Sequence, residues 1–145
     1  MKIYVASSWR NIGQPTVVKA LRANGHEVYD FRNPETGSVG FHWSEIDPKW
    51  QSWRSDEFRT ALEHPISISG LTADHRAMDW SEGTVLVMPC GRSAHLELGY
   101  AVGQRKPTFI LLADGEPELM YGLVTYLCIS LDELLHDVAI EESGL

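Results

Sequence analysis

Two apolar runs without polar alternation flank a helical pattern in the second half of the chain. Residues 84–88 and 107–112 are β-branched or apolar almost throughout, which predicts strands that are covered on both faces. Between them Ser93 can cap a helix whose apolar positions recur at helical spacing. These apolar positions are Ala94, Leu98, Ala101 and Val102. The pattern predicts strand, loop, helix and strand, with the two strands parallel because a helix connects them.

The rest of the chain continues this alternation. Strands are predicted at 2–6, 26–31, 84–88, 107–112 and 123–129. The other helices are predicted from about 14 to 24, from Ser52 or Ser55 to about 63, from about 72 to 82 after Gly70, and from a capping box at Ser130 and Glu133 to about 140. Right-handed crossovers then favour an α/β fold, a flavodoxin-like or Rossmann-like three-layer sandwich with a five-stranded, mainly parallel sheet.

Composition narrows the class of protein. A chain of 145 residues with 43% hydrophobic and 22% charged residues is typical of one globular domain, so we expect residues 1–145 to form a single domain. The net charge of −8 and the scattered basic residues argue against a nucleic-acid or membrane partner. The apolar run at the N-terminus is too short for a signal peptide, so a cytoplasmic protein is expected.

Glu97 is the first candidate for chemistry, because it is the one acidic residue on the helix between the two buried strands. It falls at the edge of the apolar stripe near the helix start, where the helix dipole favours an ionised carboxylate. Ligands of open parallel sheets bind beyond the carboxyl ends of the strands, where this residue is expected. An ionised, partly shielded carboxylate suits nucleophilic catalysis. The alternative is an ordinary helix glutamate paired with Arg92 or Lys106.

Two loops after strands combine hydroxyl groups with arginines. Ser7 and Arg10 follow the first strand, and Gly91, Arg92 and Ser93 follow the third. Backbone amides and a guanidinium there could hold an anion or a sugar hydroxyl. Neither loop matches the dinucleotide-binding or P-loop glycine pattern. The serines are equally explained as helix caps.

A second carboxylate beside Glu97 would supply the proton that a leaving base needs. Asp74 is the candidate, because near the start of its helix it could cap that helix and also face the crevice, whereas Asp79 is expected on a solvated face. Simple capping is the alternative for Asp74.

The segment 41–53 is unusually aromatic, and such side chains are costly to expose. Its aromatic residues are Phe41, His42, Trp43, Trp50 and Trp53. They either pack over the sheet, form a ligand wall on which a nucleobase could stack, or serve as a flap or subunit contact. His42, His95 and the two cysteines, Cys90 and Cys128, have no partners at ligand spacing, so neither a metal site nor a disulfide is expected.

Three segments, KIYVASSWRN, GHEVYDF and VLVMPCGRSAHLELGYAVGQRKPTFIL, resemble the nucleoside 2-deoxyribosyltransferase family, within the superfamily that includes nucleoside 5′-monophosphate N-glycosidases. The resemblance runs from residue 2 to about 128, and its most specific part is E-L-G-Y-A followed by K-P. It implies a flavodoxin-like fold, no cofactor, and a glutamate that attacks the anomeric carbon of a deoxyribose. Glu97 matches that nucleophile, and Asp74 matches the aspartate that assists proton transfer at the base.

The resemblance also implies binding residues. Trp9 lies near where the family contacts sugar and base, whereas Tyr4 is expected in the core by strand alternation. Family members complete the site with a residue from a neighbouring subunit, asparagine in the transferases and serine in the phosphate-binding hydrolases. Glu118 matches that position here, and its carboxylate would accept a hydrogen bond from a 5′-hydroxyl but repel a 5′-phosphate. A homo-oligomer, dimeric or larger, is therefore expected.

These observations favour an enzyme that cleaves the N-glycosidic bond of (deoxy)nucleosides through an ester on Glu97 and transfers the sugar to an acceptor base. Its expected partners are a nucleoside or nucleotide and a free nucleobase, without a metal. One alternative is a nucleoside 5′-monophosphate N-glycosidase that holds the phosphate with Arg10, Arg92 and Ser93. Another is a non-catalytic nucleotide-binding or sensing module in which Glu97 recognises a sugar hydroxyl.

Overall fold

The computed structural model describes residues 1–34 and 40–144. Its centre is a sheet of five parallel strands in the order β2-β1-β3-β4-β5. The strands are β1 (Lys2–Ala6), β2 (Glu27–Asp30), β3 (Gly83–Val87), β4 (Thr108–Leu111) and β5 (Tyr126–Cys128). This is the flavodoxin-like strand order, so the expected fold class is confirmed.

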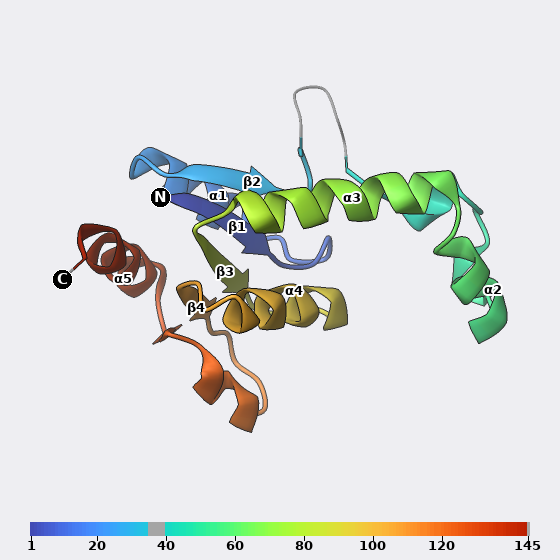
Figure 1. Ribbon diagram of the computed structural model, residues 1–145. Coiled ribbons are helices and arrows are strands. Elements are labelled where there is room, and N and C mark those ends of the chain that lie inside the picture. The colour runs from blue at the N-terminus through green and yellow to red at the C-terminus, as the bar shows by residue number, and fades with distance from the viewer. Residues whose placement is uncertain (35–39, 145) are drawn as a thin grey trace.

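Helices cover both faces of the sheet (Figure 1). The α-helices are α1 (Gln14–Ala23), α2 (Ser55–Ala61), α3 (Pro65–Trp80), α4 (Arg92–Gly103) and α5 (Leu131–Ser143). Short 3₁₀ helices are η1 (Trp43–Glu45), η2 (Trp50–Ser52) and η3 (Leu119–Leu123). No helix within the described residues has the combination of length and apolarity needed to cross a membrane.

Strand alternation divides the core into two layers. On β1, Ile3 and Val5 face one side, where they join Leu21 of α1 and Leu134 of α5 in one cluster of buried side chains. Tyr4 faces the other side and belongs to a cluster with side chains from α3 and α4. The two clusters give the three-layer arrangement, with the sheet in the middle.

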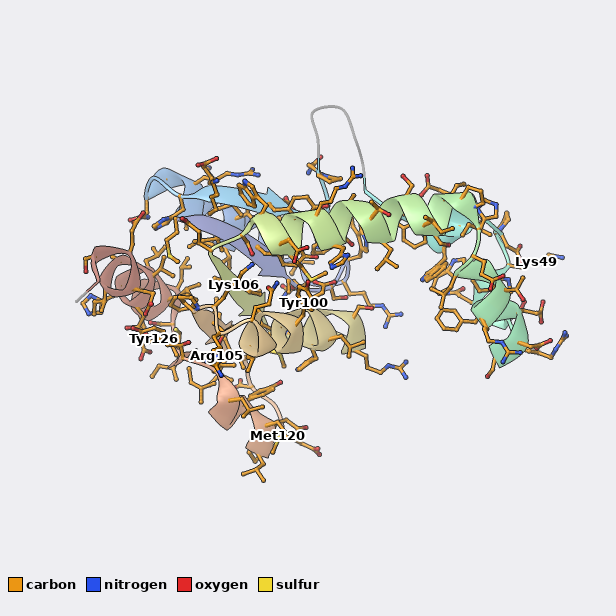
Figure 2. The ribbon with its side chains drawn as sticks, in the orientation of Figure 1. Lys49, Tyr100, Arg105, Lys106, Met120 and Tyr126 are labelled. Atoms are coloured by element: carbon orange, nitrogen blue, oxygen red, sulfur yellow. The ribbon has the colours of Figure 1, made fainter. Side chains whose placement is uncertain are left out.

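Helix α3 is longer than the sheet requires. Its C-terminal half lies on the sheet, and its N-terminal half projects from it with α2 at the far end (Figure 1). Residues 41–70 form this projecting part, called the arm below, and Figure 2 shows Lys49 near its end. The aromatic rings pack on one another: Trp43 lies edge-on to Phe41, Trp53 and Phe58, with centroids 4.7, 5.6 and 5.6 Å apart. Phe41, Trp43 and Trp53 of the aromatic segment therefore pack within the arm, whereas His42 packs on Trp9 of the loop after β1.

The sequence placed two helix starts incorrectly. Helix α3 begins at Pro65 rather than near residue 72, because proline is well suited to the first helical turn. Gly70 consequently lies inside the helix, where a side chain would meet the ring of Phe41 at about 3.1 Å. Helix α4 begins at Arg92 and has Gly91 as its N-cap, so Ser93 does not cap it.

Of the other predicted boundaries, some agree with the structure and some differ from it. The cap of α2 is Arg54 rather than Ser52 or Ser55. The last helix is as predicted, because the Ser130 side chain accepts a hydrogen bond from the amide of Glu133. The run 123–129 contains only the short strand β5, since η3 takes up its first residue.

Candidate active site

Four side chains from four different elements meet beneath α3 and α4. They are Tyr4 of β1, Tyr29 of β2, Asp74 of α3 and Glu97 of α4, called the acidic cluster below. Tyr4 and Tyr29 are partners in the parallel register of β1 and β2, so their rings stack with centroids 5.3 Å apart and planes at 15°. The paired strands thus provide an aromatic wall for the two carboxyl groups.

Asp74 is held against this wall. The Tyr29 hydroxyl donates a hydrogen bond of 2.8 Å to Oδ1 of Asp74. Burial raises the pKa of Asp74, and this hydrogen bond lowers the pKa by a smaller amount, so the net shift is upward. Because α3 begins at Pro65, Asp74 lies in the third turn of the helix and does not cap it, so the alternative of simple capping is wrong.

Glu97 is positioned by the apolar face of α4. Its neighbours Ala94, Leu98 and Ala101 are buried on the sheet, and Glu97 lies beside them, partly buried. Burial, followed by the charge of Asp74, raises its pKa to about 7, and Tyr4 has a smaller lowering effect. Glu97 is thus partly protonated at neutral pH, whereas the helix dipole led us to expect an ionised carboxylate. The dipole acts mainly within the first turn of a helix, and Glu97 lies beyond the first turn of α4.

The structure gives Glu97 no cationic partner. Among the described residues it forms no ion pair with Arg92 or Lys106. Instead, the Lys106 ammonium donates to the backbone carbonyls of Met78 and Asp79, at 2.7 and 3.3 Å. The alternative in which Glu97 is an ordinary ion-paired helix residue is therefore not what the structure shows.

Tyr4 was expected in the core, and its ring does lie there, fully buried. Its hydroxyl has no hydrogen bond of ordinary geometry within the described part of the chain. Burial, and then the nearby charges of Glu97 and Asp74, raise its pKa, so this hydroxyl stays protonated beside both carboxyl groups. Strand alternation showed which face Tyr4 occupies but did not reveal what its hydroxyl meets.

The other aspartate of α3 lies outside the cluster. Asp79 is exposed and accepts hydrogen bonds from the Tyr100 hydroxyl at 2.7 Å and from Nε2 of Gln104 at 3.1 Å. These contacts join α3 to α4 at the surface and lower the pKa of Asp79.

The loop after β1 is tied to the end of β3. The Ser7 hydroxyl donates to the Val87 carbonyl at 2.9 Å, and Nδ2 of buried Asn11 donates to the carbonyls of Val87 and Pro89 at 3.3 and 3.2 Å. Ser7 therefore holds the loop in place. Asn11 was not singled out from the sequence, because its partners are carbonyls, which any residue provides.

The remaining loop candidates are exposed. Arg10, Gly91, Arg92 and Ser93 all lie at the surface. Within the described residues, the guanidinium groups of Arg10 and Arg92 have no hydrogen bond or ion pair, so both are available to an anion.

Trp9, in the loop after β1, is 42% exposed and packs in a group of aromatic rings. Its ring centroid is 4.4 Å from that of His42 and 5.3 Å from that of Phe31. Arg32 organises this group: its guanidinium lies 5.5 Å from the Trp9 ring and donates to the carbonyls of Ser8, Trp9 and Asn11. Arg32 is a second positioning residue that the sequence did not indicate.

Glu118 directly precedes the short helix η3. It is exposed and lines a cavity of about 420 Å³ together with Cys90, His95 and Tyr121 of its own chain. Nε2 of His95 lies 2.8 Å from the Tyr121 hydroxyl, and Nδ1 donates to the Gly91 carbonyl at 2.8 Å. Burial, and then the charge of Glu97, raise the pKa of Cys90 to about 11, which keeps the thiol protonated.

The described residues contain no group of three or more histidine, cysteine or acidic side chains that could hold a metal ion. Cys90 and Cys128 are both free thiols. The candidate site is therefore an arrangement of two carboxyl groups and two phenols.

Three solved structures are similar to the chain over nearly their whole length. A 2-deoxyribosyltransferase from the psychrotolerant bacterium Bacillus psychrosaccharolyticus is 22% identical, with a TM-score of 0.62, and the match covers 93% of this chain and 90% of that one. A conserved protein from Enterococcus faecalis is 15% identical, with a TM-score of 0.62 and coverages of 100% and 99%. A CMP N-glycosidase from Clostridium botulinum is 16% identical, with a TM-score of 0.53 and coverages of 97% and 99%.

No family model and no curated protein sequence matches the chain. At the identities found, the structural likeness shows a shared fold. The chain has the α/β fold of a 2-deoxyribosyltransferase and a CMP N-glycosidase, which is the fold that the sequence resemblance predicted.

Proposed function

We propose that the protein cleaves the N-glycosidic bond of (deoxy)nucleosides through a glycosyl ester on Glu97 and transfers the sugar to an acceptor base. One observation carries this proposal: Glu97 and Asp74 share a partly buried site in which burial raises the pKa of both carboxyl groups, the charge of Asp74 raises the pKa of Glu97 further, and Glu97 forms no ion pair among the described residues. Paired carboxyl groups of this kind are typical of enzymes that cleave glycosidic bonds with a covalent intermediate.

The pair carries out this chemistry when it holds one proton. Movement of that proton from Glu97 to Asp74 leaves Glu97 ionised and Asp74 protonated. The Glu97 carboxylate then bonds to C1′ while the C1′–N bond breaks, and Asp74 gives its proton to the leaving base. In the second half, a nitrogen of the acceptor base bonds to C1′, the ester bond breaks, and Asp74 takes up the proton of the acceptor. Transfer to water instead of a base gives hydrolysis.

The second candidate is cleavage of a nucleoside 5′-monophosphate. The observation in its favour is that Arg10 and Arg92 are exposed and without partners among the described residues at the same edge of the sheet. A guanidinium is a good partner for a phosphate. Against it stands the acidic pair itself, which repels a dianion unless the arginines offset its charge.

We further propose that a second copy of the chain completes the site. Glu97 lines neither of the two cavities described for the single chain. Leu71 on α3 and Leu96 on α4 are 65% and 76% exposed and lie on the helices that carry the two carboxyl groups. Large apolar side chains exposed on neighbouring helices are typical of protein contacts. Light scattering of the wild type should give a dimer or larger, and a fully active monomer would contradict this.

The function is tested by incubating deoxynucleosides and deoxynucleoside monophosphates, each with and without a free acceptor base. The wild type should release base from deoxynucleosides and form a new nucleoside when an acceptor is present. Glu97→Gln should lower the rate at least about 10³-fold while the circular dichroism spectrum is unchanged. Glu63→Gln, an exposed glutamate at the end of α2, is the matched control and should keep full activity.

Three outcomes decide between the candidates. Base released from monophosphates only favours the second candidate over the first. A covalent sugar adduct on Glu97, detected by mass spectrometry, supports both enzymes over a binding module. Saturable binding of nucleosides with no base released over hours, and with no adduct, rejects catalysis.

A further inference from the structure

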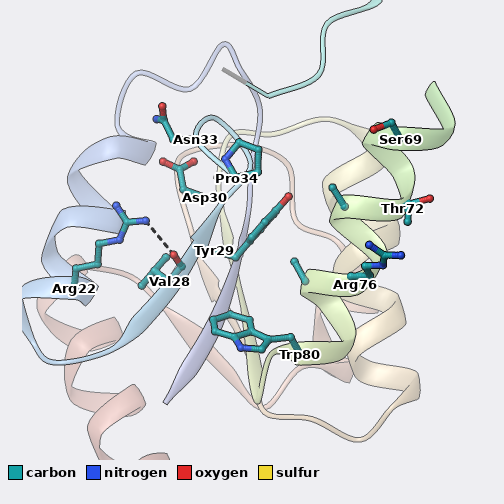
Figure 3. A pocket seen from close by; sticks show the side chains of 12 residues that line it. Arg22, Val28, Tyr29, Asp30, Asn33, Pro34, Ser69, Thr72, Arg76 and Trp80 are labelled. Atoms are coloured by element: carbon teal, nitrogen blue, oxygen red, sulfur yellow. Dashed lines mark hydrogen bonds between the residues drawn. The ribbon is translucent and has the colours of Figure 1, made fainter. Parts of the chain in front are cut away.

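A groove that shares Tyr29, but neither carboxyl group, with the acidic cluster lies between the edge strand β2 and helix α3. It has a volume of about 770 Å³, within the range of pockets for small ligands. One wall comes from Val28, Tyr29 and Asp30, and the other from Thr72, Arg76 and Trp80, which recur every fourth residue on one face of α3 (Figure 3). Neither Glu97 nor Asp74 lines it.

Arginines stand on both walls of this groove. Arg76 is exposed and has no hydrogen bond or ion pair within the described residues. Arg22 reaches the groove from α1, where one of its amino groups donates to the Val28 carbonyl at 3.0 Å, so its position is fixed while other donors stay free. The acidic residue of the lining, Asp30, is buried and its Oδ1 already accepts from Gln14 and from the amide of Arg32. The accessible charge of the groove is positive on a protein of net charge −8.

Aromatic surface completes the chemistry of the groove. Trp80 is 38% exposed, and its indole ring lies at one end of the groove, with the ammonium of Lys2 5.7 Å from the ring centroid. The side chain of Tyr29 extends from the β2 wall toward α3 (Figure 3). A flat ring can stack on such an indole, while hydroxyl groups of Ser69 and Thr72 offer hydrogen bonds along α3.

We propose that this groove is a second ligand site, which takes an anionic aromatic compound of the nucleoside monophosphate class. The guanidinium of Arg76 binds the phosphate, with Arg22 opposite, and Trp80 stacks on the base. The ligand contacts the ring of Tyr29, whose hydroxyl holds Asp74 in the acidic cluster. Occupancy of the groove therefore changes the environment of the carboxyl pair, and this last consequence rests on the proposed function.

Calorimetric titration of adenosine 5′-monophosphate into the Glu97→Gln variant tests the site without turnover. Arg76→Ala and Trp80→Leu, each added to that variant, should weaken binding at least tenfold. Arg59→Ala, which removes an exposed arginine of α2, is the matched control and should leave the dissociation constant unchanged. Adenosine and inorganic phosphate, titrated separately, should each bind more weakly than the monophosphate. Thermal melting confirms that each variant is folded.

Binding that is unchanged by both groove substitutions, or no binding at all, overturns the inference. Its failure is distinguishable from failure of the proposed function, because the binding assay needs no base release. If the wild type releases no base but binding depends on Arg76, the second ligand site is supported and the proposed function is rejected. If base release depends on Glu97 but binding is unchanged by substitution of Arg76 and Trp80, the proposed function is supported and the second ligand site is rejected.

Discussion

The sheet with its covering helices and the projecting arm are stabilised in different ways. Within the sheet layers, side chains such as Phe109 and Leu134 are fully buried and contact residues far away in the sequence. In the arm from Trp43 to Trp53, by contrast, every side chain keeps some exposure, and the aromatic contacts are edge-on ring pairs. Burial of apolar surface holds the first region, whereas ring contacts hold the second. Helix α3 belongs to both, and it carries Asp74 where they meet.

The largest expected effect is on stability. Phe109→Ala should lower the free energy of unfolding by about 3–5 kcal/mol, because it leaves a cavity in a fully buried core. Trp43→Ala should cost less than Phe109→Ala, because the Trp43 ring is partly exposed and its removal leaves no closed cavity, although three edge-on pairs worth about 0.5–1.5 kcal/mol each are lost. Urea unfolding followed by circular dichroism measures both. An arm substitution as costly as the core substitution would remove the distinction between the regions.

The second prediction concerns Asp74, the contribution of α3 to the site. Because the proposed reaction needs one proton on the pair, kcat/KM of the wild type should fall as pH rises through about 7, where Glu97 loses its proton. Asp74→Asn removes the acid and the charge that raises the pKa of Glu97. It should lower kcat/KM by about 10²–10⁴ and turn the profile into one that rises with pH, with its midpoint below 7.

Initial rates of base release between pH 5 and 9 measure both profiles. Asp79→Asn, an exposed aspartate on the same helix, is the control and should keep the wild-type profile. A wild-type rate that rises through pH 7 would show that Glu97 acts without a shared proton.

The third prediction links the charge of Glu97 to folding. Burial raises its pKa to about 7 in the folded chain from an ordinary value of 4.5, so the folded state binds the proton more tightly than the unfolded state. Stability from this group is therefore full below pH 4.5 and is lost as pH rises to about 7, by no more than about 1.4 kcal/mol per pH unit. Glu97→Gln should consequently stabilise the protein at pH 8 relative to the wild type, with the difference shrinking toward pH 4.5. Urea midpoints at several pH values measure this, and a difference independent of pH contradicts it.

Sequence patterns predicted the sheet region well because its signals are local. Unbroken apolar runs marked β3 and β4, and the position of Glu97 beside the stripe of Ala94 and Leu98 followed from helical spacing. The spacing of residues along the sequence does not reveal the distances between side chains of different helices and strands. Burial between the elements, and then the charge of Asp74, which lies 23 positions earlier in the chain, raise the pKa of Glu97, and the helix dipole alone does not account for either effect.

The arm was predicted less well for a related reason. Gly70 was taken as a helix boundary, but the ring of Phe41 occupies the place of its side chain, and that contact is not visible in the sequence around Gly70. The positioning roles of Asn11 and Arg32 were missed because both bind backbone carbonyls, which carry no residue signature.

The smallest expected effect tests the hydrogen bond between β2 and helix α3, the helix whose N-terminal half continues into the arm. Tyr29→Phe removes the hydroxyl of β2 that donates to Asp74 of α3 at 2.8 Å but keeps the ring that stacks on Tyr4. The loss in unfolding free energy should be about 0.5–1.5 kcal/mol. Because that hydrogen bond lowers the pKa of Asp74, its removal should raise this pKa further. The fall in rate at acid pH, where both carboxyl groups become protonated, should therefore occur at a higher pH.

Tyr126→Phe is the matched control, since it removes a hydroxyl that donates to Glu141 at 3.0 Å, far from the site. It should cost a similar or smaller free energy and leave the rate profile unchanged. A double-mutant cycle with Asp74→Asn separates the hydrogen bond from other effects of Tyr29. If Tyr29→Phe shifts the profile equally in the presence and absence of the Asp74 carboxylate, the Tyr29 hydroxyl does not act on the reaction through Asp74 of α3.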